Sequence, residues 1–252
     1  GRAVTPTLEA LADTGIRFSQ YRVQSSWTKP STGSLFTGLY PGQHGALYGG
    51  GDRSRYSGHV LPKRHNTLAE RLNEQGYRNF GAVMSGHISA RYQYDQGFDV
   101  YLSPGAGYTG DFSAMNQALF WMLKEQPRKG FVYLHVKGPH QPFQLAYLNK
   151  SYWPGTEYYR NGRLEPRGRF TFRSTSIVEP LREDRVNLTD EEETFLRHLY
   201  AAQLNFLDRE FVKPLLERLR TMGVFESGLF VVTGDHGEEL NDHGGYAHEE
   251  TL

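Results

Sequence analysis

Residues 77–84 read YRNFGAVM and residues 131–136 read FVYLHV, and each run is apolar enough to form a strand buried inside a sheet. Between them, residues 111–126 follow the pattern of an amphipathic helix. A strand, a helix and a second strand in this order are typical of a βαβ unit with parallel strands. The sequence therefore predicts an α/β fold with a mostly parallel central sheet and helices on both faces.

Cap residues and helical spacing predict four more helices, which begin near Thr5, Ser31, Thr67 and Thr189. Thr67 and Thr189 are each followed three residues later by a glutamate, which is the capping-box pattern. Pro214 is expected to kink the last of these helices, because proline lacks an amide hydrogen and crowds the preceding turn. Residues 229–233, LFVVT, have the apolar and β-branched character of a third buried strand.

The composition excludes several classes of protein. With 252 residues, the chain can form one large domain or a domain with a fragment of another. The 28 Lys and Arg balance the 28 Asp and Glu, which argues against a general polyanion binder, so nucleic acid is not an expected partner. The absence of cysteine excludes disulfides, thiolate metal sites and cysteine nucleophiles. No apolar run approaches the roughly 18 residues of a membrane span.

The two ends and the middle of the chain indicate how it is organised. The sequence opens at Gly1 and reaches a helical pattern within a few residues, so we interpret it as a segment of a longer protein. Residues 141–187 are polar, aromatic and arginine-rich without a clear period, which predicts an insertion or a lid over a site.

Polar residues crowd the end of the predicted strand 229–233. The run GDHGEE at residues 234–239 is followed by Asp242, His243 and His248. In open α/β sheets ligands bind beyond the carboxyl ends of the strands, and Asp with His suits a divalent cation. A solvated loop would also be polar, but it does not need Asp and His massed at a strand end. The segment is therefore predicted to hold a metal ion.

A second polar group follows the predicted strand 131–136. His135 lies inside the strand pattern, where a core histidine bonded to backbone and a functional histidine are equally good interpretations. His140 comes after the strand, and prolines on either side stiffen its loop. We expect His140 to face an anionic ligand.

The third polar group, SSWTKPSTG at residues 25–33, precedes the helix predicted to begin near Ser31. Amide groups at a helix N-terminus bind phosphate or sulfate, and a hydroxyl on a metal ion can lose its proton near neutral pH. The same hydroxyls could serve only as helix caps.

Together these segments resemble the sulfatase family of the alkaline phosphatase superfamily. Residues 28–41, TKPSTGSLFTGLYP, followed by QHG at 43–45, resemble the family signature C/S-x-P-S-R-x-S-L-x-T-G-x-Y-P. Three further segments are similar to those that flank the site in that family: TPTLEALA at 5–12, PHQPF at 139–143 and VVTGDHGE at 231–238. The resemblance spans nearly the whole chain. It implies a sulfatase-like three-layer sandwich, incomplete here, with residues 1–252 forming part of one catalytic domain.

The resemblance also implies roles for individual residues. It places Thr28 at the nucleophile position and makes Thr28, Asp235 and His236 ligands of one divalent ion, which could be Ca²⁺, Mn²⁺, Mg²⁺ or Zn²⁺. It implies that His140 and His248 act in catalysis and bind the anionic group or leaving oxygen of the substrate, and that His87 contacts the same group. Lys29 is expected to add positive charge there. The family supplies further metal carboxylates from a strand that would precede Thr5.

Two departures from the signature bear on the reaction. Active sulfatases oxidise a Cys or Ser to formylglycine, but the methyl group on the β-carbon of Thr28 prevents that conversion. Thr32 replaces the arginine of the motif. A threonyl ester must be released by an attacking water or alcohol, as phosphoryl enzymes do, so phosphorus chemistry is favoured.

We therefore expect a metal-dependent hydrolase of sulfate or phosphate esters with Thr28 as nucleophile. The alternatives are a phosphoethanolamine- or phosphoglycerol-type transferase, and a non-catalytic binding domain of the same fold. The expected substrate is an ester of a small molecule, a glycan or a lipid. By resemblance alone, a periplasmic or extracellular location is expected, which includes membrane-tethered proteins.

Overall fold

The computed structural model describes residues 4–47, 59–103, 108–140, 159–160, 163–164, 189–242 and 245–248. These residues form two compact units, each assembled from separate stretches of the chain. The sheet unit contains residues 22–137 and 233–237. The long-helix unit contains residues up to 21, residues 138–232 and residues 238–251.

A parallel sheet of three strands is the centre of the sheet unit. It contains β1 (Arg78–Val83), β2 (Val100–Leu102) and β3 (Gly130–His135) in the order β2-β1-β3, with Phe80 aligned to Val100 and to Val132. The crossover from β2 to β3 contains α5 (Tyr108–Glu125). The α/β class and the two predicted strands are confirmed. Strand β2 was not predicted from the sequence.

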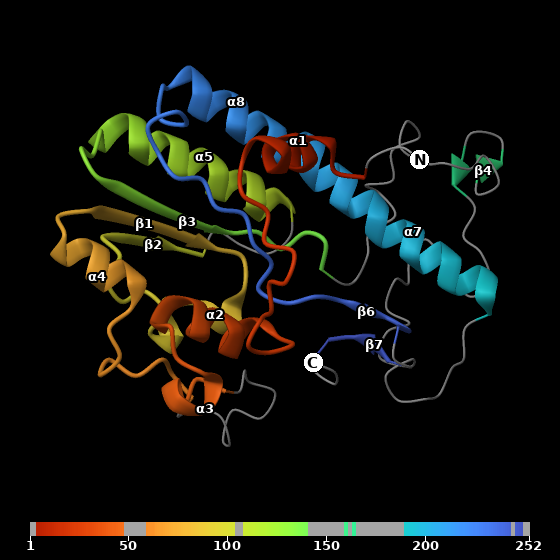
Figure 1. Cartoon of the computed structure of the whole chain (residues 1–252), viewed down its shortest axis with the longest axis horizontal. Helices are drawn as coiled ribbons and strands as arrows, with labels where there is room; N and C mark the ends of the chain where they lie inside the picture. Colours follow the sequence, from red (N-terminus) through yellow and green to blue (C-terminus); the bar gives the residue numbers. More distant parts are fainter. Residues whose placement is uncertain are drawn as a thin grey trace. The chain divides into compact units, whose positions relative to one another are not determined.

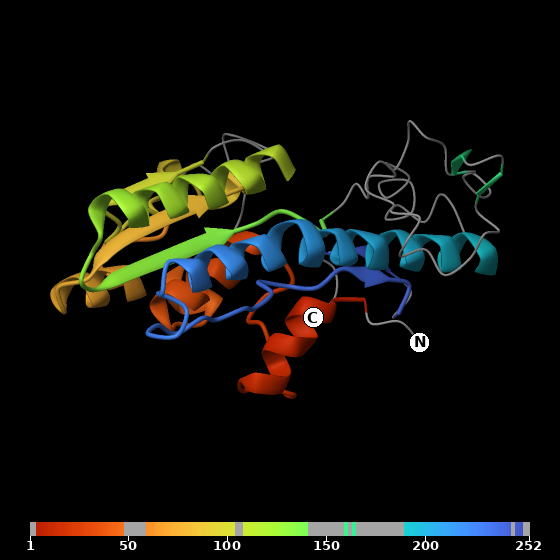
Figure 2. The same ribbon diagram turned by 90° about the horizontal axis from the view of Figure 1, so that it is seen from above.

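Alternation along β1 sends side chains to two different cores. Phe80 and Ala82 pack with Trp121 and other residues of α5 on one face. Val83 lies on the other face, in a core that includes Phe36 and the tyrosines of the neighbouring strands. Figures 1 and 2 show α5 on one side of the strands and α2 (Thr28–Thr37) on the other. The sheet unit is thus a helix–sheet–helix sandwich.

Short helices complete the sheet unit. The capping box predicted at Thr67 is confirmed: Thr67 Oγ1 accepts from the Glu70 amide at 3.2 Å, and Glu70 Oε2 accepts from the Thr67 amide at 2.7 Å. It opens α4 (Leu68–Glu74). The remaining short helices are α3 (Pro41–His44), η1 (Gly86–Ile88) and η2 (Ala90–Tyr92).

The long-helix unit is named for one nearly continuous rod, visible in Figures 1 and 2 as α7 running into α8. Helix α7 (Asp190–Leu207) passes through a π-helical turn at Asp208–Val212 into α8 (Lys213–Thr221). Pro214 therefore lies within the first turn of α8, and the regular α-helix is interrupted before this proline, at the π-helical turn. The widened turn replaces regular α-helical bonding at the place where proline would otherwise crowd the preceding carbonyl.

Helix α1 (Pro6–Thr14) receives its N-terminal cap from a distant part of the chain. Thr5 occupies the N-cap position as predicted, but its side chain makes no capping bond. Instead, the buried carboxylate of Asp208 accepts from the amides of Thr7 and Leu8 at 2.9 and 2.8 Å. The side-chain amide of Asn205, near the end of α7, donates to the carbonyl of Val4, the residue before Thr5, at 2.7 Å. The π-helical turn thus anchors α1.

The prediction of a buried strand at residues 229–233 is wrong for the described structure. The segment has no regular secondary structure and pairs with no strand among the described residues, and Leu229 and Val231 are 91% and 70% exposed. Its apolar character reports a preference for burial, which only a paired neighbouring strand and a covering helix can satisfy. The predicted insertion at 141–187 lies outside the described residues except β4 (Tyr159–Arg160) and β5 (Arg163–Leu164), which pair antiparallel.

Beyond residue 237 the chain returns as a short antiparallel hairpin. Strands β6 (Glu239–Leu240) and β7 (Tyr246–Ala247) pair Glu239 with Ala247. No helix within the described ranges combines the length and the apolar content that a membrane span requires.

Candidate functional site

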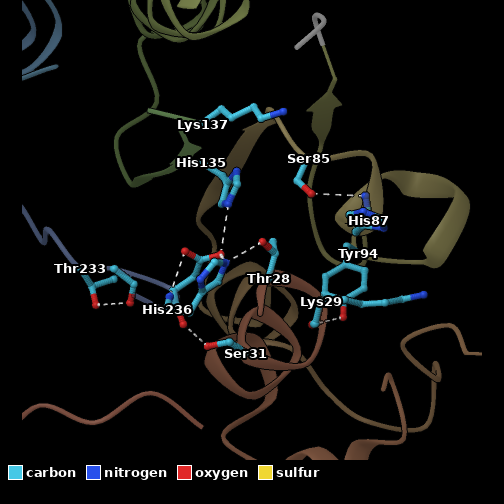
Figure 3. Close-up of polar contacts among 12 residues, drawn as sticks. Thr28, Lys29, Ser31, Ser85, His87, Tyr94, His135, Lys137, Thr233 and His236 are labelled. Carbon is cyan, nitrogen blue, oxygen red and sulfur yellow. Dashed lines mark hydrogen bonds and ion pairs between the residues drawn. The ribbon is translucent and has the colours of Figure 1, made fainter. Parts of the chain in front are cut away.

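Three segments of the sheet unit bring polar side chains to one place (Figure 3). Thr28 is the first residue of α2, His135 ends β3, and Asp235 and His236 follow the segment 229–233. Thr28 Oγ1 lies 3.1 Å from His236 Nε2, and Asp235 Oδ2 lies 3.4 Å from His135 Nε2. Residues about 100 to 200 positions apart in the sequence therefore form one polar cluster.

A hydrogen bond to backbone orients the ring of His236. Nδ1 lies 2.8 Å from the carbonyl oxygen of Gly237, which can only accept, so in the neutral imidazole Nδ1 carries the proton. The lone pair of Nε2 is then directed towards the hydroxyl of Thr28. This arrangement suits either acceptance of the Thr28 proton or a bond to a metal ion.

The carboxyl group of Asp235 is ionised in this environment. Burial alone would raise its pKa, but the hydrogen bond and charge of His135, with His236 and Thr28 adding smaller effects, lower the pKa well below its usual range. His236 Nε2 lies 3.7 Å from the same carboxylate oxygen. The cluster therefore presents one fixed negative charge beside a hydroxyl and two imidazoles.

The first turn of α2 is held rigidly, which fixes Thr28. Ser31 Oγ donates to the carbonyl of Asp235, which joins α2 to the segment that carries the carboxylate. The hydroxyl of buried Tyr94 donates to the carbonyl of Lys29 at 2.6 Å. The helix begins at Thr28, earlier than the predicted start near Ser31, because Pro30 is well tolerated in a first turn.

The signature residues Gly33 and His44 form a structural contact behind this helix. His44 is fully buried, and its Nδ1 accepts from the amide of Ala46 at 3.1 Å while Nε2 faces the carbonyl of Pro30 at the same distance. A Cβ atom at Gly33 would come within 2.7 Å of the His44 ring. Burial lowers the pKa of His44, so the ring is a neutral spacer rather than a charge.

The structure does not bring the ammonium group of Lys29 to Thr28. Lys29 is fully buried, and its Nζ lies 3.7 Å from the centroid of the Tyr92 ring. In Figure 3 the side chain points away from Thr28 and His236. Burial lowers the pKa of Lys29 to about 8. A role for its charge in catalysis stays a prediction from the resemblance.

His87 lies in η1 of the sheet unit, next to the aromatic side chain that precedes Thr28. Its ring contacts the Trp27 ring edge-on, with the centroids 6.2 Å apart. Its amide donates to Ser85 Oγ at 3.4 Å. His87 is exposed, so it is accessible to a ligand.

His140 and His248 lie together in the long-helix unit. Their ring centroids lie 4.9 Å apart in an edge-on arrangement. Glu238 joins them, with Oε1 at 3.3 Å from His248 Nδ1. The ligand atoms of these three residues all lie within 4.8 Å of one another.

The donor set around Thr28 could hold a divalent cation. Metal–ligand bonds of about 2.1 Å place neighbouring ligand atoms about 3.0 to 3.4 Å apart. The Nε2 of His236 lies 3.1 Å from Thr28 Oγ1 and 3.7 Å from Asp235 Oδ2, so a small shift of the second pair would bring it into this range. A hydroxyl, an imidazole nitrogen and an ionised carboxylate suit Zn²⁺ or Mn²⁺ and are compatible with Ca²⁺ or Mg²⁺.

Sequence reasoning missed or undervalued three residues. His135 was weighed equally as a core and a functional residue, and the structure gives it a carboxylate partner. Ser31 was expected only near a helix start, and Glu238 was not singled out. The position of His135 at a strand end was a usable signal, whereas the partnership of Glu238 with His248 needs the β6–β7 pairing to be known.

Comparison with known proteins gives one family. The family model described as Sulfatase matches residues 1–251. Solved structures that share the fold include the following three. The phosphonate monoester hydrolase of Agrobacterium radiobacter aligns with a TM-score of 0.65 at 20% identity over 95% of this chain and 59% of its own. The C-terminal periplasmic domain of EcEptC from Escherichia coli, in complex with Zn, aligns with a TM-score of 0.53 at 15% identity. The alignment covers 98% of this chain and 61% of that domain. Ps i-CgsB, in complex with k-i-k-neocarrahexaose, aligns with a TM-score of 0.53 at 18% identity. The alignment covers 88% of this chain and 50% of Ps i-CgsB.

These identities show likeness of fold alone. The chain spans 50% to 61% of the length of these three structures.

Proposed function

Because the chain belongs to the sulfatase family, we propose that the protein cleaves phosphate or sulfate esters with Thr28 as nucleophile and one divalent metal ion. The observation that carries this proposal is the position of Thr28 Oγ1, at the start of α2 and 3.1 Å from His236 Nε2. Family members are metal-dependent enzymes of the hydrolase type. The substrate and the nucleophile are our proposal.

The chain's own residues support nucleophilic attack by Thr28. As the Thr28 oxygen bonds to the phosphorus, its proton passes to solvent water. The bond from phosphorus to the alcohol oxygen breaks, and that oxygen takes up a proton from water, so that the alcohol departs neutral. A water then attacks the phosphorus, the bond from phosphorus to the Thr28 oxygen breaks, and phosphate leaves. One proton of that water goes to the Thr28 oxygen, which restores the hydroxyl. His236 and Asp235 hold the hydroxyl in place, and the α2 amides face the developing negative charge.

Thr28, Asp235 and His236 would hold the metal ion. When bound, such an ion lowers the pKa of the hydroxyl and offsets charge on the ester oxygens. His135 then orients the Asp235 carboxylate through its 3.4 Å contact, as outer partners of metal ligands commonly do. From the family resemblance we retain the proposals that His140, His248 and His87 contact the ester group and that residues 141–187 form a lid.

Phosphate is the favoured centre, since a threonyl ester of phosphate can be released by water. An acceptor alcohol in place of water would make the protein a transferase with the same first step. The proposed substrates are esters of small molecules, glycans or lipids. A periplasmic or extracellular site of action is supported by the periplasmic domain among the similar structures.

The test is turnover of p-nitrophenyl phosphate, bis-p-nitrophenyl phosphate and p-nitrophenyl sulfate by the protein. Thr28→Ala should lower kcat at least about 1,000-fold, because the nucleophile is lost. Thr28→Ser keeps the hydroxyl and should retain most of the activity. Thr37→Ala, at the other end of the same helix, is the matched control and should behave like the wild type.

A trapped intermediate gives a second readout. Rapid quenching should leave a phosphoryl group on the peptide that contains Thr28. Wild-type turnover by Thr28→Ala would remove Thr28 from the mechanism. Binding of phosphate without turnover of any of the three esters would instead favour a non-catalytic binding domain.

A further inference from the structure

We propose that Glu193 and Arg197 of α7 are positioning residues, which hold the β6–β7 hairpin so that His248 keeps a fixed place. These residues and the hairpin belong to the long-helix unit, so the inference uses contacts within one unit. It rests on the proposed function, in which His248 contacts the ester group, and it adds two residues that act on the reaction through His248.

The hairpin is too short to hold itself. Strands β6 and β7 contain two residues each, and the pairing of Glu239 with Ala247 leaves His248 directly after the second strand. An isolated two-stranded hairpin is at best marginally stable in water. The place of His248 therefore depends on what supports the hairpin.

One face of α7 lies along the hairpin. Figures 1 and 2 both show the two strands beside this helix. Glu193, Arg197 and Tyr200 share a face, because residues four and seven apart on a helix lie above one another. Burial, and then the charge of Glu238, raise the pKa of Tyr200, so this face extends to the residue before β6.

Arg197 holds the hairpin at two points. One guanidinium nitrogen donates to the carbonyl of Leu240 at 2.6 Å, and the other donates to Asp242 Oδ1 at 3.0 Å. The second carboxylate oxygen of Asp242 accepts from the amide of Leu240 at 3.3 Å. The side chains of Arg197 and Asp242 are 44% and 50% exposed, so their ion pair contributes little by itself. The bond to the backbone of buried Leu240 is therefore the main support.

Glu193 holds the turn between the two strands. Its Oε1 accepts from the hydroxyl of Tyr246 at 3.0 Å and from the side-chain amide of Asn241. Asn241 has a φ of 70°, a left-handed conformation that asparagine tolerates better than most residues, and its backbone amide donates to the carbonyl of Gly245 at 2.8 Å. One oxygen of α7 thus links the residue after β6 to the first residue of β7.

The first experiment measures the hairpin and needs no turnover. Arg197→Met removes both donated bonds and keeps an apolar stem, and Glu193→Ala removes the acceptor at the turn. In both variants we expect hydrogen exchange at the amides of Leu240 and Asn241 to become at least about 10-fold faster, because exchange follows local opening.

The imidazole of His248 provides a direct readout of its position. Its ring resonances, identified by their loss in His248→Ala, should shift in both α7 variants. Arg218→Met and Glu217→Ala, which change exposed residues of α8, are the matched controls and should leave exchange and the ring resonances unchanged. Circular dichroism shows whether each variant is folded, and Arg197→Lys, which keeps the charge without the fork of two donors, should give a smaller effect of the same kind.

The second experiment measures turnover of the aryl ester that the wild type cleaves fastest. Misplacing a group that contacts the ester should lower kcat/KM about 10- to 100-fold in Arg197→Met. In a protein that already carries His248→Ala, the same change should lower kcat/KM less than about 3-fold, because the effects of residues that act as one unit do not add.

Two results would overturn the positioning role. One is unchanged exchange and unchanged His248 ring resonances in both α7 variants, and the other is an equal loss of kcat/KM from Arg197→Met with and without His248. A wild type that cleaves no ester would contradict the proposed function instead, and the exchange and ring measurements would then decide by themselves whether α7 places His248.

Discussion

Replacing Lys29 with methionine removes a buried positive charge from the first turn of α2 and keeps a side chain of similar length. Lys29 is fully buried, and burial lowers its pKa from 10.5 to about 8. Between these values the unfolded chain holds a proton that the folded chain has lost. The free energy of unfolding should therefore rise with pH across this window.

The size of the effect follows from two opposing contributions. The gap between 10.5 and about 8, at about 1.4 kcal/mol per pH unit, corresponds to about 3 kcal/mol. The contact of the ammonium with the Tyr92 ring, at 3.7 Å, favours the charged form by about 1–2 kcal/mol and so reduces the cost of burying the charge. We expect the wild type to gain about 1–2 kcal/mol between pH 7.5 and 9.5.

Urea unfolding followed by tryptophan fluorescence provides the assay. The upper pH is chosen below 10 because burial raises the pKa of Tyr94 and Tyr101, which should reduce stability above that pH. Lys29→Met should lack the gain and be more stable than the wild type at pH 7.5. Lys124→Met, an exposed lysine of α5, is the matched control and should keep the wild-type pH dependence.

An equal rise in the wild type and in Lys29→Met would refute this reasoning. It would mean that another group titrates in the window, or that Lys29 keeps its proton by reaching solvent. A loss of stability in Lys29→Met at pH 7.5 would show that the contact with the Tyr92 ring outweighs the cost of burying the charge.

Two further predictions concern packing and capping. Gly81→Ala places a Cβ atom 2.6 Å from the Tyr101 ring between β1 and β2, so the free energy of unfolding in urea should fall by about 1–3 kcal/mol. The control Gly86→Ala meets no atom within 4 Å, so its free energy of unfolding should fall by less than about 1 kcal/mol. Asp208→Ala removes the acceptor for two amides of α1, so the free energy of unfolding should fall by about 1–2 kcal/mol and hydrogen exchange at those amides should become faster. Asp13→Ala, on the exposed side of α1, should change neither quantity. Unchanged exchange in Asp208→Ala would contradict the capping role.

Several elements could be predicted from the sequence because the information is local. The apolar runs at residues 77–84 and 131–136 predict buried strands, and the pair Thr67 and Glu70 predicts its capping box from four consecutive residues. The signature at 28–41 places a hydroxyl at a helix start. The same local pattern fails at residues 229–233, where burial depends on neighbouring strands and not on the apolar run itself.

The sequence by itself determined the α/β class, a helix in the signature segment and the polar residues that follow the strands. Only the tertiary structure decided that His135 meets Asp235 and that the cap of α1 comes from Asp208. It also decided that the Lys29 ammonium lies against the Tyr92 ring and that Glu238 lies beside His248. The physical reason is range. Periodicity along one element reports which side chains prefer burial, whereas the meeting of residues 100 to 200 positions apart depends on strand register and on the path of the chain between them.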